Sequence, residues 1–283
     1  MTLQPSVSVM MTVYNGEKYV SQAIHSIRRQ SLADFEFVIV DDGSTDRTPE
    51  LLAEAQARDS RLKVITAARL GRAKALNLAW REASGAYIAN LDADDLAEPA
   101  RLERQLAYLQ QQPDIGLLGT ACRVLDNKKE SERVVYQPLT DAELRRRLVR
   151  QNPFVHSSVM MPRRVLESLG GYNEHFRISV DYELWVRLAQ KYRLANLPDV
   201  LTAKRVHSQA YFQRRILTWD KCKARIVIRW QAWRALSNSA MDFRFVVLEP
   251  VSRWFFSWAS NASRPNQPSP KCSMMIEGEY EPK

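Results

Sequence analysis

The stretch VSVMMTVYNGEKYVSQAIHSIRRQSLADFEFVIVDDGSTD, residues 7–46, decides the fold. Two short apolar runs, Val7 to Val13 and Phe35 to Val40, are rich in β-branched residues and predict strands. The segment between them, Glu17 to Gln30, has the periodicity of a helix. A strand, a helix and a second strand in this order are typical of a βαβ unit, in which the two strands run parallel.

The same alternation continues to about Gly119. Further strands are expected at Leu62 to Thr66 and Tyr87 to Leu91, and further helices at Thr48 to Arg58 and Arg72 to Ala83. The sequence therefore predicts an α/β fold with a mostly parallel central sheet and helices on both faces. Ligands of such sheets bind beyond the carboxyl ends of the strands.

Polar and acidic residues follow three of the predicted strands. They are Tyr14, Asn15 and Gly16 after the first strand, Asp41 and Asp42 after the second, and Asp92, Asp94 and Asp95 after the fourth. The carboxyl ends of parallel strands share one edge of a sheet. We therefore expect these carboxylates to converge on one crevice at that edge.

The densest charge lies in YIANLDADDLAEP, residues 87–99. Three carboxylates this close repel one another unless water, hydrogen bonds or a cation offset the repulsion. Mg²⁺ and Mn²⁺ prefer hard oxygen ligands and take the rest of their shell from substrate phosphates and water. The alternative is that Asp92 and Asp95 serve a helix that begins near Pro99, as its N-cap and first-turn acid.

The neighbouring loops offer groups that a nucleotide would need. Asp42 could accept hydrogen bonds from a ribose hydroxyl or a base N–H, and the ring of Tyr14 offers a surface for stacking. Arg72 and Lys74, in LGRAKALN, begin a helix and could meet a diphosphate. The alternatives are turn and capping roles for residues 41–46 and a merely solvated position for the two basic side chains.

The composition is that of a globular protein with unevenly placed charge. The chain has 283 residues, 45% of them apolar, which is enough for one large domain or two small ones. Of its formal charge of +9, residues 204–260 contribute eleven Lys or Arg against three Asp or Glu. Three widely spaced cysteines, Cys122, Cys222 and Cys272, indicate neither a disulfide framework nor a zinc site and favour a reducing, cytoplasmic setting. We expect no signal peptide and no membrane-spanning helix.

Four stretches, in this order and spacing, resemble one enzyme family. They are residues 7–46, GRAKALNLAWREASGAYIANLDADDLAEPARLERQ (71–105), HSSVMMPRRVLESLGGYNEHF (156–176) and VDYELWVRLA (180–189). Together they resemble the family 2 glycosyltransferases, which have the GT-A fold. The resemblance covers about Ser6 to His207.

The resemblance implies roles for residues at the acidic edge. Thr12, Tyr14 and Asp42 match positions that contact the base and ribose of a nucleotide, with Asp42 as the partner of uracil. In the D-x-D motif, Asp92 is similar to the residue near the ribose and Asp94 to the ligand of Mn²⁺ or Mg²⁺. His207, in KRVHSQ, is similar to a late histidine that approaches the metal or the diphosphate.

Asp181 matches the general base of the family. An inverting displacement needs a base that takes the proton of the acceptor hydroxyl and a Lewis acid that stabilises the departing diphosphate. Many relatives carry Glu-Asp at this place, whereas here Val180 precedes Asp181, so Glu183 stays open as an alternative base. His156 and Ser157 match a region that lines the acceptor pocket, and a structural strand is the alternative for them.

The implied function is that of an inverting, metal-dependent glycosyltransferase. It would move a sugar from a nucleotide-diphosphate donor, expected to be UDP-linked, to a hydroxyl of a saccharide or lipid-linked acceptor, in the synthesis of a cell-surface polysaccharide or glycolipid. Residues 1–119 would bind the donor and residues 120–207 the acceptor, within one GT-A domain. Processive synthases of the family carry Gln-x-x-Arg-Trp and membrane spans. Here Ile226 stands where the Gln would precede Arg229-Trp230, which favours a single addition.

Two other classes of function remain as alternatives. A non-catalytic protein could keep the nucleotide fold and dock on a membrane or a partner through its basic tail, but it would have no need of the complete set Asp42, Asp92, Asp94 and Asp181. A nucleotidyltransferase would need a glycine-rich basic loop after the first strand, and TVYNGEKY is not such a loop.

The C-terminal part is basic and rich in tryptophan. Residues 208–262 are expected to form an amphipathic helical extension, and residues 263–283 a disordered tail. In a helix from Trp219 to Leu236, one face would hold Trp219, Cys222, Ile226, Trp230, Trp233 and Leu236, flanked by basic residues. This layout suits a helix on an anionic membrane surface, so the protein could be peripheral on the cytoplasmic face. Packing on the catalytic domain or on a second copy is the alternative. Since no nucleic-acid recognition motif accompanies the basic residues, nucleic acid is not expected as a partner.

Overall fold

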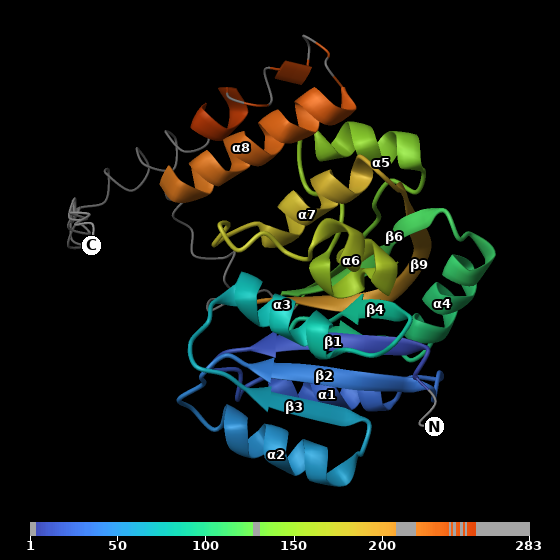
Figure 1. The fold of residues 1–283 in the computed structure, drawn as a ribbon, viewed down its shortest axis with the longest axis vertical. Helices are drawn as coiled ribbons and strands as arrows, with labels where there is room; N and C mark the ends of the chain where they lie inside the picture. Colours follow the sequence, from blue (N-terminus) through green and yellow to red (C-terminus); the bar gives the residue numbers. More distant parts are fainter. Residues whose placement is uncertain are drawn as a thin grey trace, which may run out of the picture.

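One sheet of nine strands forms the centre of the molecule, in the order β3-β2-β1-β4-β8-β6-β9-β5, with β7 paired to β6. The computed structural model (Figure 1) describes residues 4–126, 131–207, 219–237, 239, 242–243, 246 and 248–252. The strands are β1 (Val7–Val13), β2 (Phe35–Asp41), β3 (Leu62–Thr66), β4 (Tyr87–Asn90), β5 (Leu96–Ala97), β6 (Ile115–Asp126), β7 (Ser131–Val135), β8 (Met160–Pro162) and β9 (Arg193–Val206).

Eight α-helices accompany the sheet in the described residues. They are α1 (Val20–Arg28), α2 (Thr48–Arg58), α3 (Arg72–Glu82), α4 (Arg101–Gln111), α5 (Asp141–Leu148), α6 (Arg163–Leu169), α7 (Val180–Ala189) and α8 (Trp219–Leu236), with a 3₁₀ turn, η1, at His156–Ser158. The bounds predicted for β1, β3, α2 and α8 are confirmed to the residue.

The four strands from β3 to β4 are all parallel, as the sequence predicts. Val7 of β1 lies opposite both Phe35 of β2 and Tyr87 of β4. Beyond β4 the sheet becomes mixed, because β8 is antiparallel to β4 and to β6, whereas β9 is parallel to β6. The expected division at residue 119 lies inside β6, so the donor and acceptor halves share one sheet.

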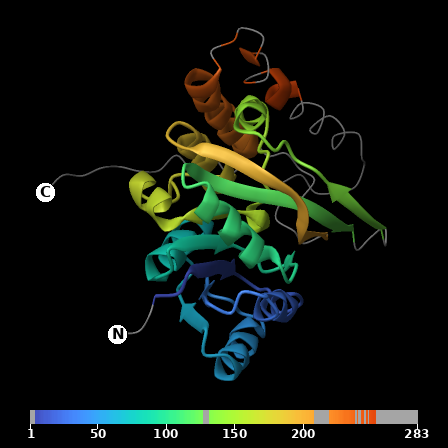
Figure 2. The same cartoon turned by 90° about the vertical axis from the view of Figure 1, so that its right-hand side faces the viewer.

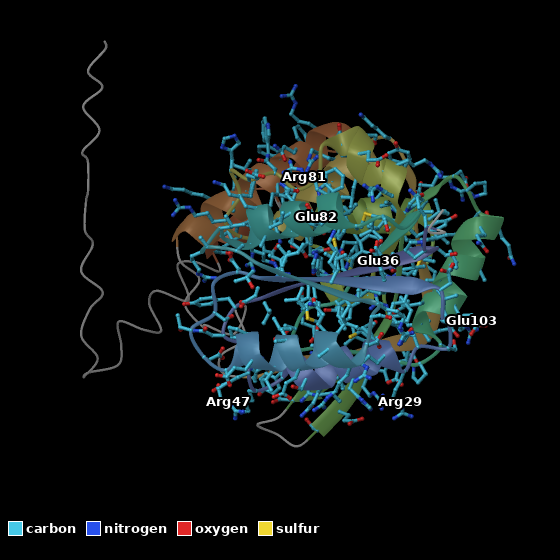
Figure 3. The ribbon with its side chains drawn as sticks, turned by 60° about the horizontal axis from the view of Figure 1, so that its bottom comes forward. Arg29, Glu36, Arg47, Arg81, Glu82 and Glu103 are labelled. Atoms are coloured by element: carbon cyan, nitrogen blue, oxygen red, sulfur yellow. The ribbon has the colours of Figure 1, made fainter. Side chains whose placement is uncertain are left out.

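Alternation along the strands sends apolar side chains to two separate core layers. Met10, Val38 and Ile88 face the layer that contains α3, α6 and α7. Val9, Met11, Phe37 and Ile39 face the opposite layer, which α1, α2 and α4 cover. Figure 3 shows the sheet between these layers, with Arg81 and Glu82 on the α3 side and Arg29 and Arg47 on the α1 and α2 side.

Helix α8 packs against α5 and α7 at the far end of the molecule from α2 (Figure 1). The side chains it buries are Cys222, Ile228, Arg229 and Ala232, and Arg229 forms an ion pair of 2.6 Å with Glu249. The predicted face of α8 is not buried as a unit, because Cys222 is buried whereas Trp230 is 42% exposed and packs beside Trp233 and Phe243. Ile228 and Ala232 belong to the core cluster that includes α7, whereas Trp230 does not.

Other parts of the C-terminal prediction lie outside the described residues. They are the side chain of Trp219, residues 208–218 and 253–262, which include Trp254 and Trp258, and the tail 263–283. None of the described helices combines the length and apolar character that a bilayer span requires.

Candidate active site

The loops after β1 and β2 are bound to each other at the carboxyl edge of the sheet. The backbone N–H of Asn15 donates to Ser44 Oγ at 2.9 Å, and the N–H of Thr45 donates to Asn15 Oδ1 at 2.8 Å. Asn15 has a positive φ of 50°, a conformation that asparagine tolerates better than most residues. These contacts agree with the turn role considered for residues 41–46, and Thr12, in β1, lies opposite Val40 of β2.

Asp42 lies under the loop that joins β3 to α3. Its carboxylate accepts hydrogen bonds from the N–H groups of Leu70 at 2.6 Å and Gly71 at 3.1 Å. It also forms an ion pair of 3.0 Å with Arg69. The Arg69 guanidinium also lies over the ring of Tyr14, at 3.2 Å from its centroid. Arg69 therefore fills the space between the two groups that were predicted to hold a nucleotide base.

Asp92, the first carboxylate of the D-x-D motif, is paired with two nitrogen-bearing side chains. Arg72 Nη2 donates to Asp92 Oδ1 at 2.7 Å, and His156 Nδ1 lies 2.9 Å from the same oxygen. Burial raises the pKa of Asp92, but Arg72 and His156 outweigh it and hold that pKa well below its usual range. Asp92 is thus a fixed anion, and Arg72 is held at the edge where the diphosphate was expected.

His156 and Ser157 lie beneath the D-x-D loop and are both buried, so their contacts are with the acidic residues and not with an open acceptor pocket. His156 Nε2 lies 2.9 Å from Asn90 Nδ2, and its Nδ1 lies 2.9 Å from Asp92 Oδ1 and 3.1 Å from Arg72 Nη2. Ser157 Oγ accepts from the backbone N–H of Asp92 at 3.1 Å and donates to Asp95. The two residues therefore support the carboxylates.

Asp95 is not a helix cap. Helix α4 begins only at Arg101, after the short strand β5, and no side chain caps it. Asp95 is 1% exposed, and besides Ser157 it accepts the backbone N–H of Arg205 in β9 at 2.9 Å. Burial, with the nearby carboxylates of Asp94 and Asp92, raises the pKa of Asp95 to about 7. The residue joins the D-x-D loop to the acceptor half.

Asp94 and His207 meet at this edge from residues far apart in the chain. Asp94 Oδ2 and His207 Nε2 are 3.0 Å apart, and their side chains are 33% and 13% exposed. A carboxylate oxygen and an imidazole nitrogen are suitable ligands for Mn²⁺. No set of three or more His, Cys, Asp or Glu side chains in the described parts of the chain is arranged to hold a metal ion. These two residues fit an ion that takes its remaining ligands from phosphate and water.

Asp181 is the second residue of α7 and does not cap the helix, since no side-chain cap bond is formed there. Its Oδ2 accepts a hydrogen bond of 2.8 Å from Asn152 Nδ2. Burial lowers the pKa values of Arg72 and Lys204, but neighbouring carboxylates raise them. The largest such contribution comes from Asp92 for Arg72 and from Asp95 for Lys204. The negative charge of Asp181 contributes to both. Asp181 therefore acts electrostatically on the same arginine that Asp92 binds.

Glu183, the alternative base, is 2% exposed and engaged in structure. Arg187 binds both of its carboxylate oxygens, at 2.8 and 2.9 Å. The same guanidinium holds the carbonyl oxygens of Leu169 and Gly171. The geometry favours Asp181 as the carboxylate that could take a proton.

Comparison with known proteins agrees with this site. The model of the family described as glycosyl transferase family 2 matches residues 8–170, more than half of the chain. The chain belongs to glycosyltransferase family 2. This glycosyltransferase is 31% identical over 223 residues to the amylovoran biosynthesis glycosyltransferase AmsE of Erwinia amylovora, covering 77% of this chain and 82% of that protein. The non-catalytic alternative has no support from these relatives.

Solved structures confirm the fold of the glycosyltransferase. Staphylococcus aureus TarS 1–349 in complex with UDP-GlcNAc superposes with a TM-score of 0.70 at 20% identity, covering 89% of this chain and 73% of that one. The mannosyltransferase PcManGT of Pyrobaculum calidifontis, in complex with GDP-Man and Mn²⁺, has a TM-score of 0.63 at 22% identity and covers 94% and 77%. The GT-A fold predicted from the sequence is confirmed.

Three residues of the glycosyltransferase site were not predicted. Arg69 gave no signal, because a lone arginine in a loop is usually solvated. Burial lowers the pKa of Lys204, in β9, but the charges of Asp95, Asp92 and Asp181 outweigh it, and only the strand pairing of the acceptor half brings Lys204 near them. Asn152 precedes Pro153 in QNPFVHSS, and its proximity to a candidate functional segment, residues 156–157, was the one available indication.

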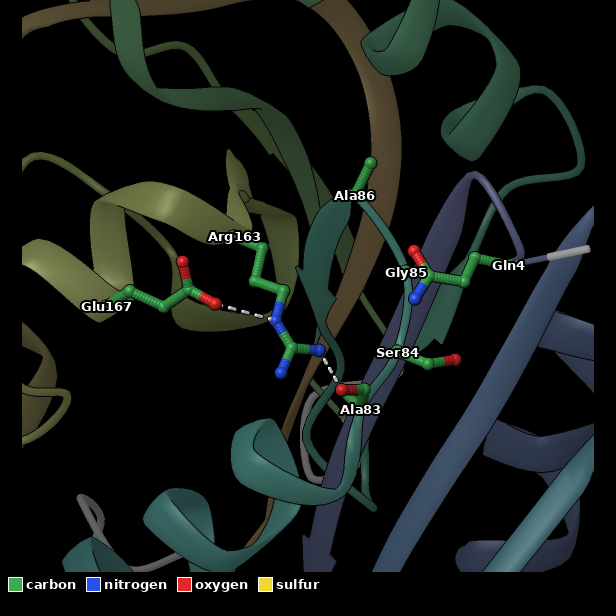
Figure 4. A pocket seen from close by; sticks show the side chains of 7 residues that line it. All are labelled: Gln4, Ala83, Ser84, Gly85, Ala86, Arg163 and Glu167. Carbon is green, nitrogen blue, oxygen red and sulfur yellow. Dashed lines mark hydrogen bonds and ion pairs between the residues drawn. The ribbon is translucent and has the colours of Figure 1, made fainter.

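A separate pocket of about 430 Å³ lies at the opposite edge of the sheet, before the first residues of β1 and β4 (Figure 4). Its lining includes Gln4, Gly85, Arg163 and Glu167, and the last two pair with each other at 2.9 Å. Since its charges are neutralised internally and it is remote from Asp92 and Asp181, we assign it no part in the chemistry.

Proposed function

We propose that the protein is an inverting, metal-dependent glycosyltransferase that uses a nucleotide-diphosphate sugar, UDP-linked, and a hydroxyl acceptor in polysaccharide or glycolipid synthesis. The observation that supports the proposal is the ion pair of 2.7 Å between Asp92 and Arg72, a cation on which the negative charge of Asp181 also acts. A donor-side carboxylate and a candidate base then share one polar centre, as a displacement at a single carbon requires. The kinship with AmsE supports the polysaccharide pathway.

The donor would bind at the edge formed by the loops after β1, β2 and β3. Tyr14 and Asp42, with Thr12 at the end of β1, would surround the base, and Arg69 would have to leave the face of Tyr14 for the base to stack there. Arg72 carries a charge that the diphosphate needs. The complex of TarS with UDP-GlcNAc supports a UDP-linked donor, although GDP-Man in PcManGT leaves a second base to be tested.

Asp94 and His207 would hold Mn²⁺ or Mg²⁺, as their 3.0 Å separation permits. When bound, the ion would stabilise the negative charge of the departing diphosphate. Asp181 would accept the proton of the acceptor hydroxyl. At the same time the hydroxyl oxygen would bond to the anomeric carbon of the donor, and the bond from that carbon to the diphosphate oxygen would break. Arg72 would remain beside the leaving group and favour its charge.

The metal assignment is tested with the Asp94→Ala variant. The full chain is incubated with UDP-glucose, UDP-galactose, UDP-N-acetylglucosamine or GDP-mannose and Mn²⁺, and the released nucleotide is measured. We expect the wild type to release nucleotide from one donor class and the variant to lose this activity by about a hundredfold or more. Glu50→Ala, an exposed acid on α2, is the control. Equal activity of Asp94→Ala and the control would contradict the assignment.

A membrane surface is the second part of the proposal. Val227 and Trp230 of α8, together with Phe243, are between 42% and 46% exposed, and Lys223 and Arg234 are exposed on the same helix. Aromatic rings with flanking cations suit the interface of an anionic bilayer. Helix α8 packs on α7, the helix that carries Asp181. Contact of α8 with a membrane would therefore bring a lipid-linked acceptor to the acceptor side.

A further inference from the structure

We infer that Asn152 is a positioning residue for Asp181, holding one carboxylate oxygen so that the other faces the acceptor hydroxyl. The inference rests on the proposed function, in which Asp181 is the base. It adds a residue from the acceptor half, on the loop between α5 and η1, to the catalytic arrangement.

The orientation of the Asn152 amide is determined by its own loop. Its Oδ1 accepts the backbone N–H of Phe154 at 3.0 Å, so its Nδ2 is the group that faces α7. From there Nδ2 donates to Asp181 Oδ2 at 2.8 Å. An amide clamped in this way offers a donor in a single direction, which is what a fixed carboxylate orientation requires.

The loop is docked on α7 at a second point. The ring of Phe154 meets Trp185 edge to face, with centroids 6.2 Å apart, and Trp185 is fully buried. Asp181 and Trp185 are four residues apart and lie on the same side of the helix. The contact of Asn152 with Asp181 is therefore held by a buried aromatic pair one turn away.

Asp181 carries out no other structural task that would explain its partner. Among the described residues its Oδ1 accepts no hydrogen bond, and its side chain does not cap α7. Two residues before it, Ser179 has φ 53° and ψ 34°, a left-handed conformation that costs a non-glycine residue energy. An amide that binds one oxygen of Asp181 and leaves the other open is the arrangement expected of a base and not of a helix cap.

The charged and titratable groups around Asp181 come from three other elements. Arg72 belongs to α3, Lys204 to β9, and Tyr172 to the turn between α6 and α7, and each interacts with the charge of Asp181. These groups act whether or not Asn152 is present, so the test has to separate the loss of the amide donor from the effect of an added charge.

The test compares two matched asparagines. Asn152→Asp keeps the acceptor for the Phe154 N–H but replaces the donor to Asp181 with a like charge. Asn173 has the same arrangement on the neighbouring carboxylate, since its Oδ1 accepts the N–H of His175 at 3.1 Å and its Nδ2 lies 3.5 Å from Glu183 Oε1. Asn173→Asp is thus the control for charge and fold.

With the donor panel and Mn²⁺, we expect Asn152→Asp to lower kcat by about tenfold to a hundredfold. The donor KM should stay unchanged, and the acid limb of the pH–rate profile should move up by about one pH unit. Asn173→Asp should leave kcat and the acid limb of the pH–rate profile near those of the wild type. A variant of Asn152 that changes only thermal stability, with kcat and the pH profile intact, would overturn the inference.

A measurement without substrate separates this inference from the proposed function. The carboxyl carbon of Asp181 is titrated by ¹³C NMR in the full chain, with its signal assigned through Asp181→Asn. Asn152→Asp should displace that titration, and identical curves would sink the inference whatever the enzyme transfers. Conversely, if Asp181→Asn keeps full activity while the titration is displaced, the base assignment is wrong but the contact is real.

Discussion

Arg69 occupies the position on Tyr14 that a nucleotide base would take. Its contact with the ring is worth about 0.5–1 kcal/mol, and its ion pair with Asp42, in which the guanidinium is exposed and the carboxylate is buried, about 0.2–1 kcal/mol. Both must be broken before a base can stack. We therefore expect Arg69→Ala to bind UDP about threefold to tenfold more tightly than the wild type, as measured by isothermal titration calorimetry.

The control for this prediction is Arg81→Ala. Arg81 also lies over an aromatic ring, that of Trp80, at 5.8 Å, but on α3 away from the carboxyl edge. It should leave UDP affinity unchanged. Weaker binding by Arg69→Ala would mean that the guanidinium contacts the nucleotide instead of competing with it.

Single residues of the site were predictable where their role depends on local spacing. Tyr14, Asp42 and the D-x-D carboxylates follow strands directly, so strand ends and the resemblance were enough to find them. Their partners were not predictable in the same way. His156 meets Asp92 from 64 residues away, and Asn152 meets Asp181 across 29, through loop paths that no local pattern determines.

At the scale of elements, the turn between α2 and β3 is held by a compact ion cluster. Asp59 accepts hydrogen bonds from Arg61 and from Arg28, and its side chain is 9% exposed. The hydrogen bond from Arg61 is the main cause that lowers the pKa of Asp59 from 3.8 to about 2. Since the folded pKa is the lower one, this contribution to stability is complete above pH 4 and is lost as the pH falls through about 2.

We expect Asp59→Asn to lower the free energy of unfolding at pH 7 by about 1–2 kcal/mol, allowing for the partly exposed arginines. The difference from the wild type should narrow between pH 4 and pH 2. Urea unfolding at pH 7, 4 and 3 measures it. Glu54→Gln, which removes an exposed pair of 3.8 Å with Arg58, should change little. A deficit in Asp59→Asn that is independent of pH would point to packing instead of charge.

Elements with a clear period of two or 3.6 residues were predicted closely, and those that serve the site were not. Helix α1 begins at Val20 and not at Glu17, because Glu17 accepts the N–H of Arg47 from the next loop. The strand considered as the alternative for His156 and Ser157 is wrong, because residues 156–158 form a turn that places His156 under Asp92 and β8 begins only at Met160. Tertiary hydrogen bonds override local propensity at these places.

At the scale of the whole molecule, the acidic and the basic regions lie at different places in the fold. The two halves share one sheet, and the acidic edge lies where the strands of the first half meet β9 of the second. The basic helix α8 lies on the outer side of α7 (Figure 2), so the excess positive charge is carried beyond the acceptor half. The sequence predicted the helix and its charge, but which side faces α7 depended on the shape of a partner that the periodicity does not describe.

This placement determines how membrane contact should be tested. A chain cut at His207 would expose the partners of Cys222, Ile228 and Ala232 on α5 and α7, so loss of binding could follow from loss of fold. Charge reversal at exposed positions of α8 avoids this problem. The double variant Lys223→Glu with Arg234→Glu changes the net charge and leaves the buried face of α8 unchanged. The control, Arg47→Glu with Arg81→Glu, makes the same change in net charge in the two layers that cover the sheet (Figure 3).

The wild type and the control pair should float with vesicles that contain phosphatidylserine, and the variant in α8 should stay at the bottom of the gradient. Each basic residue near an anionic surface contributes about 1 kcal/mol, so the two reversals should weaken binding by about a hundredfold or more at low salt. Neutral vesicles should bind none of the three proteins strongly. A wild type that does not float would contradict the proposal of membrane binding. An equal loss of vesicle binding in both double variants would mean that net charge alone, and not the surface of α8, attracts the lipid.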